Sequence, residues 1–336
     1  MILDIVIIAV TSYAIYLIGE KFATASSRLG DYFHLSKSVK GATFDAISSS
    51  FPELMIAVFS VVAFKQFEVG VGTIVGSAFF NLLIIPGICV LVAPVIFKVS
   101  REIMHRDAIF YNISVLALLS AVIYSSNWSW SVPIIFLLIY FWYLRTIARH
   151  TKDHRKINEK AEETKEISLT KEISVALISM GVIALASYFM TDSAISIAEV
   201  LNISPVIIAF SVIAAATSIP DAVISIINAK KGNVDDAIAN VFGSNTFNIL
   251  VILSVPVLLL NIFNGEAAVE VVFDQIEILL GLLGATILVI YYLAEDDTIS
   301  RKEAWMMIAL YFVFLFYLAY LSIGSSVVAQ LSKLFV

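Results

Sequence analysis

Ten long apolar segments constrain the fold of this 336-residue chain more than any other feature of its sequence. A helix needs about 20 mainly apolar residues to cross the hydrocarbon core of a bilayer. The segments are continuous, whereas the strands of an outer-membrane barrel would alternate polar and apolar residues over about ten positions. We therefore predict an all-α polytopic membrane protein with ten transmembrane helices, at residues 3–19, 39–64, 69–97, 108–125, 129–147, 173–190, 204–229, 237–263, 276–294 and 304–323.

The scarcity of charged residues excludes the common soluble classes of protein. Asp, Glu, Lys and Arg make up 14% of the chain, hydrophobic residues make up 60%, and the mean hydropathy is +0.94. A soluble domain carries about 25% charged residues, so the polar surface of a soluble enzyme or a secreted disulfide scaffold is missing here. A formal net charge of −6 also argues against a nucleic-acid partner. The one cysteine, Cys89, cannot form an internal disulfide.

The distribution of Lys and Arg predicts the orientation in the cell membrane. With the N-terminus outside, 19 of the 21 Lys and Arg residues fall in inner loops, and only Lys65 and Lys333 remain outside. We therefore expect both termini to be extracellular. The mixed-charge segment 149–172 then becomes a cytoplasmic linker, either a solvated connector or a regulatory segment. It divides the chain into a first half, 1–148, and a second half, 173–336, each with five helices.

The two halves carry the same pair of motifs. SSSFPE at 48–53 is answered by ATSIPD at 216–221, and GSAFFN at 76–81 is answered by GSNTFN at 243–248. Because five is an odd number, the second half enters the membrane from the opposite side, and the repeats must be inverted. Inverted-repeat folds place their binding site near the midplane of the membrane, on broken helices where the repeats meet.

The residues of the motifs favour a site for a hard cation. Glu53 and Asp221 lie deep in apolar segments, where an isolated charge costs at least about 2.5–3.5 kcal/mol, so we expect both to face one shared site. Pro52 and Pro220 lack an amide hydrogen, and each frees a carbonyl oxygen four residues earlier. A single such motif could be only a kink with packing serines, but its duplication with matching carboxylates argues against that reading. The complete set offers only oxygen, which suits Ca²⁺ or Na⁺ and disfavours zinc or copper: Ser48, Ser49, Thr217, Ser218, Asn81 and Asn248 add hydroxyl and amide oxygens.

Other residues in these segments receive structural or open interpretations. The Gly76-Ser77 and Gly243-Ser244 pairs are expected to allow close approach of neighbouring helices. Asp45 has no acidic counterpart, because Ile213 occupies the matching position. It lies in a hydrated vestibule, pairs at a helix end, or attracts ions.

At these residues the chain resembles the cation/Ca²⁺ exchanger superfamily, and specifically the Na⁺/Ca²⁺ exchangers, a family defined by two alpha repeats. The resemblance is specific over about 39–95 and 204–260. It implies alternating access by movement of the first and sixth helices past the other eight. It also implies these ion ligands: the side chains of Glu53, Ser49, Ser77, Asn81, Thr217, Asp221, Ser244 and Asn248, with the backbone oxygens of Ala46 and Ala214. Ser49 stands where many relatives have Thr, and Asp45 replaces a common apolar residue.

The resemblance implies a minimal, prokaryotic-type sodium/calcium antiporter that exchanges about three Na⁺ for one Ca²⁺. Potassium-dependent relatives carry Asp at the position of Asn248, so the chain is similar to the potassium-independent branch. A Ca²⁺/H⁺ exchanger and a K⁺-dependent exchanger remain the alternatives. An intramembrane aspartyl protease would need a Gly-x-Gly-Asp motif, which the sequence lacks, and a channel fits inverted repeats poorly. We expect no enzymatic activity, no cofactor, Na⁺, Ca²⁺ and the lipid bilayer as partners, and a monomer sufficient for transport.

Overall fold

The computed structural model describes residues 1–34, 40–125, 127–158, 168–263, 269–270 and 276–332, and nearly all of this part is helical. Eight of its helices are long and apolar enough to cross a membrane. Two further pairs of helices pass the same test as pairs, with bends of 58° and 43° at short breaks, which brings the number of spans to ten. The prediction of an all-α polytopic membrane protein with ten spans is therefore confirmed.

The first half supplies five spans. They are formed by α1 (Ile2–Tyr32); by η1 (Gly41–Asp45), α3 (Ala46–Ser49) and α4 (Phe51–Val62); by α5 (Phe67–Phe79), η2 (Phe80–Ile84) and α6 (Ile85–Val92); by α7 (Arg101–Ile103), η3 (Met104–Ala108) and α8 (Ile109–Tyr124); and by α9 (Ser131–Asn158). The segments labelled η are turns of π-helix, each five residues long, and they lie inside otherwise α-helical spans.

The second half repeats this order. Its spans are α10 (Leu169–Leu201); α11 (Pro205–Ile208), η4 (Ala209–Ile213), α12 (Ala214–Thr217) and α13 (Ile219–Lys230); α14 (Val234–Phe247), η5 (Asn248–Ile252) and α15 (Ser254–Phe263); α16 (Ile276–Asp296); and α17 (Arg301–Ser332). The π-turns η1 and η4 begin at Gly41 and Ala209, 168 residues apart, so the inverted repeat extends to local helix geometry. Two short strands, β1 (Asn127–Trp128) and β2 (Val269–Glu270), pair antiparallel between the halves.

Several helices are longer than the apolar segments predicted, and α17 covers Arg301–Ser332 where 304–323 was expected. The helix expected at 3–19 continues to Tyr32, the one expected at 173–190 covers Leu169–Leu201, and the one expected at 129–147 continues to Asn158. Hydropathy marks the hydrocarbon core, whereas the backbone hydrogen bonds of a helix continue wherever the next residues form helix readily. The outer parts of the predicted 149–172 linker are therefore helical, and its centre, 159–167, lies outside the described residues.

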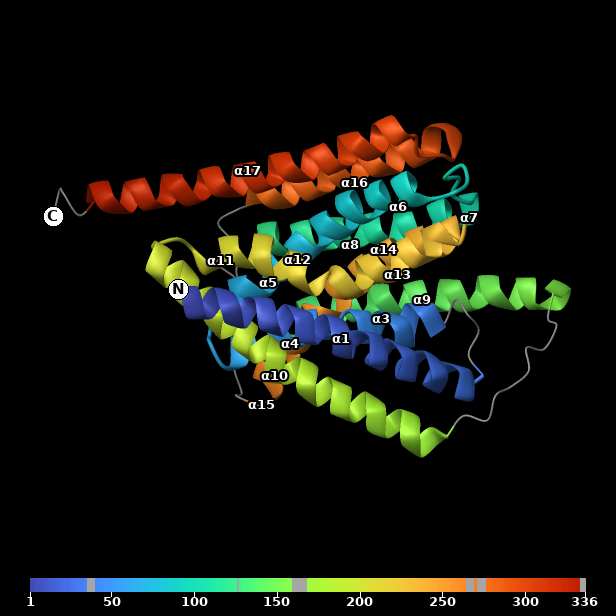
Figure 1. Cartoon of the computed structure of the whole chain (residues 1–336), viewed down its shortest axis with the longest axis horizontal. Coiled ribbons are helices and arrows are strands. Elements are labelled where there is room, and N and C mark those ends of the chain that lie inside the picture. Colours follow the sequence, from blue (N-terminus) through green and yellow to red (C-terminus); the bar gives the residue numbers. More distant parts are fainter. Residues whose placement is uncertain (35–39, 126, 159–167, 264–268, 271–275, 333–336) are drawn as a thin grey trace.

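α1 and α10 form an antiparallel pair that lies across the broken spans α3–α4 and α12–α13 (Figure 1). Their buried residues belong to a hydrophobic cluster separate from the main core of the bundle, with Ile15 and Phe22 from α1 and Ile183 and Met190 from α10. A salt bridge of 2.9 Å joins Arg28 Nη1 to Glu172 Oε1 between the two helices. The same hydrophobic cluster includes Phe51 and Ile56 of α4 and Ile213 of η4, so the pair packs through it against both broken spans.

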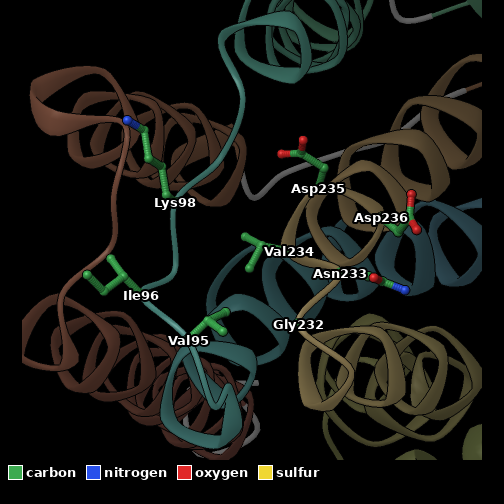
Figure 2. Close-up of a pocket in the computed structure, with 8 residues that line it drawn as sticks. All are labelled: Val95, Ile96, Lys98, Gly232, Asn233, Val234, Asp235 and Asp236. Atoms are coloured by element: carbon green, nitrogen blue, oxygen red, sulfur yellow. The ribbon is translucent and has the colours of Figure 1, made fainter.

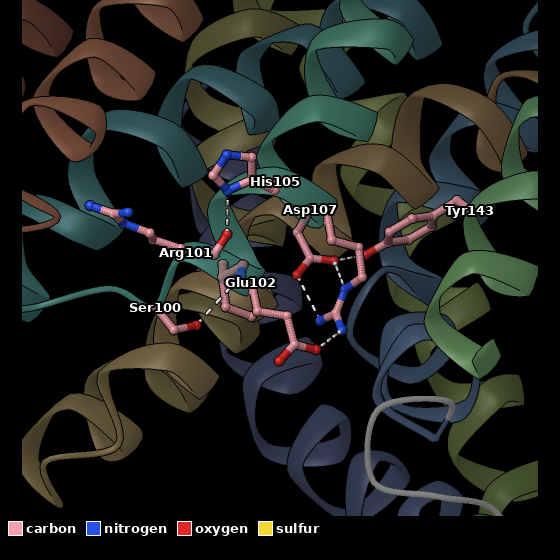
Figure 3. A network of polar contacts seen from close by, with 8 residues as sticks. Ser100, Arg101, Glu102, His105, Asp107 and Tyr143 are labelled. Atoms are coloured by element: carbon pink, nitrogen blue, oxygen red, sulfur yellow. Dashed lines mark hydrogen bonds and ion pairs between the residues drawn. The ribbon is translucent and has the colours of Figure 1, made fainter. Parts of the chain in front are cut away.

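A buried network of charges joins the beginning of the fourth span to α9 (Figure 3). Arg106 lies 2.8 Å from one carboxylate oxygen of Asp107 and 2.9 Å from Oε1 of Glu102. The hydroxyl of Tyr143, on α9, donates to the other oxygen of Asp107 across 2.7 Å. Each buried charge has a partner of opposite sign or a hydrogen-bond donor, which is the condition under which charges persist inside a membrane protein.

Both visible ends of the chain lie on the same side of the bundle. The N-terminus and the C-terminal end of α17 lie at the left in Figure 1, while the end of α9 and the beginning of α10 lie at the right. An even number of spans requires this arrangement.

Candidate cation site

The first proline motif breaks its span directly before Glu53. The backbone turns at Ser50, and the two helical segments on either side meet at 58°. Two hydrogen bonds of 3.0 Å cross the break, from Ser50 N to the carbonyl of Ala46 and from Leu54 N to the carbonyl of Ser50. Pro52 has no N–H to extend this ladder, so the break follows directly from the sequence.

The second motif forms the same break 168 residues later in the chain. Ser218 N donates to the carbonyl of Ala214 across 3.1 Å, and Ala222 N donates to the carbonyl of Ser218 across 3.0 Å. The side chains match as well, because the hydroxyls of Ser49 and Thr217 donate to the carbonyls of Ala46 and Ala214, each across 3.3 Å. Both breaks therefore present a carboxylate, a hydroxyl and a backbone oxygen within seven residues of one another, about two helical turns.

Asp221 lies at the centre of a set of hydrogen-bond donors. The hydroxyl of Ser244 donates to its Oδ1 across 3.0 Å, and Nδ2 of Asn81 donates to its Oδ2 across 3.1 Å. Asn240, one turn before Ser244 on α14, donates to the backbone oxygen of Asp221 across 3.2 Å. The carboxylate of the second repeat is thus held by donors from both repeats.

Glu53 occupies the matching position but has no donor. It is fully buried, and neither of its carboxylate oxygens makes a hydrogen bond. The Asp221 carboxylate lies close enough for its charge to act on Glu53, and the hydroxyls of Thr217 and Ser77 lie near the Glu53 carboxylate without completing a hydrogen bond. Ser77 bonds instead to the hydroxyl of Ser218, across 2.8 Å. A buried carboxylate beside a second carboxylate, with no donor of its own, is the arrangement that a bound cation would complete.

Further polar atoms in the site also lack hydrogen-bond partners. Oδ1 of Asn81 and both side-chain polar atoms of Asn248 are buried without a hydrogen bond. None of the ten predicted site residues is more than 4% exposed: Ala46, Ser49, Glu53, Ser77, Asn81, Ala214, Thr217, Asp221, Ser244 and Asn248. The site is therefore closed to both faces of the membrane. Hydrogen bonds join Asn81 and Ser244 to Asp221, Ser49 to Ala46, and Thr217 to Ala214. Glu53 and Asn248 make no side-chain hydrogen bond and are placed by their burial and their positions on α4 and η5.

The groups that could bind a cation here offer oxygen atoms, and none of them is a His or Cys side chain. Among the described residues, no group of three or more His, Cys, Asp and Glu side chains is placed to hold a metal ion. The candidate site has two carboxylates, and its other groups are hydroxyls, amides and carbonyls. Such a set suits a hard cation that is bound transiently.

Two asparagines that hydrogen-bond to site residues were not identified from the sequence. Asn240 and Asn245 both lie on α14, and Asn245 accepts a hydrogen bond of 3.0 Å from Asn81. The available signal was the difference between the GSAFFN and GSNTFN motifs, in which Asn245 answers Ala78.

The two glycines of these motifs also differ in role. A Cβ at Gly76 would overlap the carbonyl oxygen of Phe210 and lie 2.7 Å from Cβ of Ala214, so Gly76 permits the close approach that was predicted. At Gly243 the nearest atom would be the hydroxyl oxygen of Tyr143, at 3.7 Å, which is ordinary contact. The prediction of close helix approach is therefore confirmed for Gly76 and wrong for Gly243.

A recess of about 360 Å³ lies elsewhere, between the loop that follows α6 and the beginning of α14. Figure 2 shows Val95, Ile96 and Lys98 on the loop opposite Val234, Asp235 and Asp236 on the helix. None of the ten predicted site residues lines it. The candidate cation site is thus a closed polar cluster rather than an open surface pocket.

Inverted five-helix repeats, with two broken spans that bring buried carboxylates together, define a polytopic secondary transporter. The family model described as "Sodium/calcium exchanger protein" matches residues 3–148 and 171–320. The chain therefore belongs to the sodium/calcium exchanger family, within the cation/Ca²⁺ exchanger superfamily.

Individual relatives and solved structures agree with this assignment. Human sodium/potassium/calcium exchanger 3 is 41% identical over 133 residues, which are 39% of this chain but only 20% of that protein. A structure of the sodium-calcium exchanger NCX_Mj aligns with this chain over 93% of this chain and 97% of the NCX_Mj chain, with a TM-score of 0.63 and 23% identity. The H⁺/Ca²⁺ exchanger CAX covers 99% of this chain and 87% of its own, with a TM-score of 0.74 and 13% identity. At these identities the two structures support the fold.

Proposed function

We propose that the protein is a sodium/calcium antiporter that exchanges about three Na⁺ for one Ca²⁺ by alternating access. The observation that carries the proposal is the Glu53 carboxylate, fully buried, without a hydrogen-bond donor, and acted on by the charge of Asp221. Two carboxylates balance the charge of one Ca²⁺, and Ca²⁺ prefers about six to eight oxygen ligands.

The proposed ligands are the ten residues predicted from the sequence. The carbonyls of Ala46 and Ala214 each already accept two hydrogen bonds, one from an amide and one from a hydroxyl. A cation that binds these carbonyls requires the hydroxyls of Ser49 and Thr217 to turn away, and the turned hydroxyls then offer their own oxygens. Binding would thus recruit the carbonyl and the hydroxyl of each break together.

The charge balance predicts that transport is electrogenic. With Glu53 and Asp221 ionised, the site is neutral with one Ca²⁺ and carries a charge of +1 with three Na⁺. One net charge would therefore cross the membrane in each cycle, which is worth about 2.3 kcal/mol per 100 mV. With the termini outside and the 149–172 linker inside, as the 19-to-2 split of Lys and Arg supports, the membrane potential would favour Ca²⁺ export.

Two other couplings have an observation in their favour. The likeness in fold to the H⁺/Ca²⁺ exchanger CAX favours exchange for protons. The identity with a sodium/potassium/calcium exchanger over 39% of the chain favours a K⁺ requirement. Asn248 argues against the K⁺ requirement, because it places a neutral amide where the resembling K⁺-dependent exchangers carry a carboxylate.

The test is uptake of ⁴⁵Ca²⁺ into proteoliposomes that contain the purified protein. Gradients of Na⁺, K⁺ and H⁺ are imposed one at a time, with Glu53→Gln liposomes as the matched control. We expect internal Na⁺ to drive uptake, and an inside-positive potential to accelerate it. Uptake that follows a proton gradient and ignores internal Na⁺ would show a cation/proton exchanger instead.

A further inference from the structure

Asn81 uses both of its amide hydrogens in the described structure. Its Nδ2 donates to Oδ2 of Asp221 across 3.1 Å and to Oδ1 of Asn245 across 3.0 Å. An amide nitrogen carries two hydrogens, so its donor capacity is full. Oδ1 of Asn81 is left buried without a partner and is the atom available to a cation.

The orientation of Asn245 is set in turn by a backbone group. Nδ2 of Asn245 donates across 3.3 Å to the carbonyl oxygen of Ala78, on α5. A backbone carbonyl can only accept, so Asn245 must present nitrogen to Ala78 and oxygen to Asn81. The chain of hydrogen bonds therefore has one permitted direction, from Asn81 through Asn245 to the backbone.

A reversal of the Asn81 amide would break two contacts at once. Its oxygen would then face Oδ2 of Asp221 and Oδ1 of Asn245, two acceptors, and its hydrogens would point toward the place of the cation. Both effects oppose binding of a positive ion. Asn245 supplies one of these two restraints, through its hydrogen bond from Asn81.

The other repeat lacks this arrangement. The residue that corresponds to Asn245 is Ala78, 167 positions earlier, whose side chain cannot accept a hydrogen bond. Asn248, which corresponds to Asn81, is buried with both amide atoms unpaired. Only one of the two symmetry-related amides is therefore held in a fixed orientation.

We propose that Asn245 is a positioning residue for cation binding, which holds the Asn81 amide so that its oxygen faces the site shared by Glu53 and Asp221. The proposal rests on the proposed function, because it assigns the cation to that site. Asn245 acts through Asn81 and does not itself bind the ion. The asymmetry further means that hydrogen bonds fix the orientation of the first-repeat amide, whereas none fixes that of the second-repeat amide.

The experiment is a double-mutant cycle on the concentration of Ca²⁺ that gives half-maximal Na⁺-driven flux in proteoliposomes. Asn245→Ala installs the residue that the first repeat already carries, and Asn245→Leu keeps about the same volume without hydrogen bonds. Each is expected to raise the half-saturating Ca²⁺ concentration about ten-fold, the value of one lost hydrogen bond in a buried polar site. The maximal flux is expected to change less than about two-fold.

The decisive comparison is made in the background of Asn81→Ala. If Asn245 acts through Asn81, its replacement produces no further change there, because the group that it positions is absent. The matched control is Asn261→Ala, which removes a buried amide on α15 whose Nδ2 donates within its own helix, to the carbonyl of Val257 across 2.8 Å. That control is expected to leave the half-saturating concentration unchanged in both backgrounds.

The outcomes separate this inference from the proposed function. Effects of Asn245→Ala and Asn81→Ala that multiply would overturn the positioning role and leave Asn245 as an independent contributor. An Asn245→Ala protein with wild-type half-saturation would overturn it as well. Absence of Na⁺-driven Ca²⁺ flux in the wild-type protein would instead refute the proposed function itself.

Discussion

Ser187 of α10 donates a hydrogen bond from its hydroxyl to the carbonyl oxygen of Pro52, across 3.5 Å. The symmetry-related contact joins α1 to the other repeat, because a Cβ at Gly19 would lie 3.7 Å from Cγ of Pro220. The two contacts are equivalent in the repeat, because position 187 lies 168 residues after position 19 and position 220 lies 168 residues after position 52. Each member of the α1–α10 pair thus crosses the proline directly before the carboxylate of the opposite repeat. Movement of this pair would therefore act on the two broken helices.

The contact at Gly19 predicts a dependence on side-chain size. Gly19→Ala should keep near-normal Na⁺-driven Ca²⁺ flux, because 3.7 Å is ordinary contact distance for a methyl group. Gly19→Leu should lower the flux about ten-fold or more, since overpacking costs about 1–3 kcal/mol and falls on the ring of Pro220. Gly181→Leu on α10 is the matched control, because no atom lies within 4 Å of a Cβ at that position. Equal flux in the two leucine variants would contradict a functional contact between α1 and Pro220.

The two motif glycines should respond differently to the same substitution. Gly76→Ala places a methyl group on the carbonyl oxygen of Phe210, and backbone must shift to receive it. We expect a lower melting temperature in detergent and a loss of flux, from a cost of about 1–3 kcal/mol. Gly243→Ala meets only the Tyr143 hydroxyl at 3.7 Å and should melt and transport like the wild-type protein. Equal destabilisation by both changes would show that the packing around α14 is as tight as that around α5.

Asp221 accepts hydrogen bonds from side chains and Glu53 accepts none, and this difference predicts a difference in thermal stability between their variants. Glu53→Gln and Asp221→Asn should both abolish Ca²⁺ exchange and the rise in melting temperature that Ca²⁺ produces. A ligand at one hundred times its dissociation constant stabilises by about 2.7 kcal/mol, so the wild-type rise should be measurable. Without cations, Glu53→Gln should be more stable than the wild-type protein, because it replaces a buried carboxyl group that makes no hydrogen bond by a neutral amide.

Asp221→Asn should bring no such gain, since Asp221 already accepts hydrogen bonds from Ser244 and Asn81. The measurement is thermal unfolding in a Na⁺-free and Ca²⁺-free buffer with choline as the cation. Retention of near-normal exchange by either variant would remove that residue from the primary ligands. Equal stability of the two ion-free variants would show that Glu53 has donors of its own.

The sequence predicts those parts of the site that depend on local chemistry. Pro52 and Pro220 determine where the spans break, and the inverted repeat brings Glu53 and Asp221 together, so these features follow from spacing alone. The pairing of Ser77 with Ser218 depends on which hydroxyl the packed helices bring closest, which no spacing encodes. The restraint of Asn81 by Asn245 depends on the direction of a hydrogen-bond chain that ends on the backbone of Ala78. Helix ends such as Tyr32 were missed because hydropathy reports the bilayer and not the helix.

The orientation of the chain can be tested by labelling. In a Cys89→Ala background, cysteines replace Lys65 between α4 and α5 and Lys231 between α13 and α14. The distribution of Lys and Arg predicts that a membrane-impermeant maleimide labels position 65 from outside and position 231 only after permeabilisation. Cys89 itself is buried, so its replacement removes background labelling without exposing a surface. Labelling of both positions from the same side would contradict ten spans in inverted repeats.

Transport is predicted to be independent of K⁺, and Asn248 supplies the reason. A K⁺ ion beside Ca²⁺ would add a third positive charge to a site whose only two carboxylates are Glu53 and Asp221. A carboxylate at position 248 would offset that charge at close range, whereas a neutral amide offers only a dipole oxygen. Asp45 lies on η1, on the other side of the break at Ser50, where the charges that act on it are those of Lys40 and Asp31 rather than that of Glu53.

Replacement of K⁺ by choline should therefore leave Na⁺-driven Ca²⁺ flux unchanged in the wild-type protein. Asn248→Asp should introduce a dependence on K⁺, since both amide atoms of Asn248 are buried without partners and a carboxylate there would need a cation. Asn233→Asp, an exposed position at the beginning of α14, is the control that adds the same charge outside the site. Because the chain is also similar to a sodium/potassium/calcium exchanger, the response to K⁺ removal distinguishes K⁺-independent from K⁺-dependent exchange. A wild-type flux that collapses without K⁺ would mean that the site holds an anionic ligand besides Glu53 and Asp221, and Asp45→Asn would then be the first variant to examine.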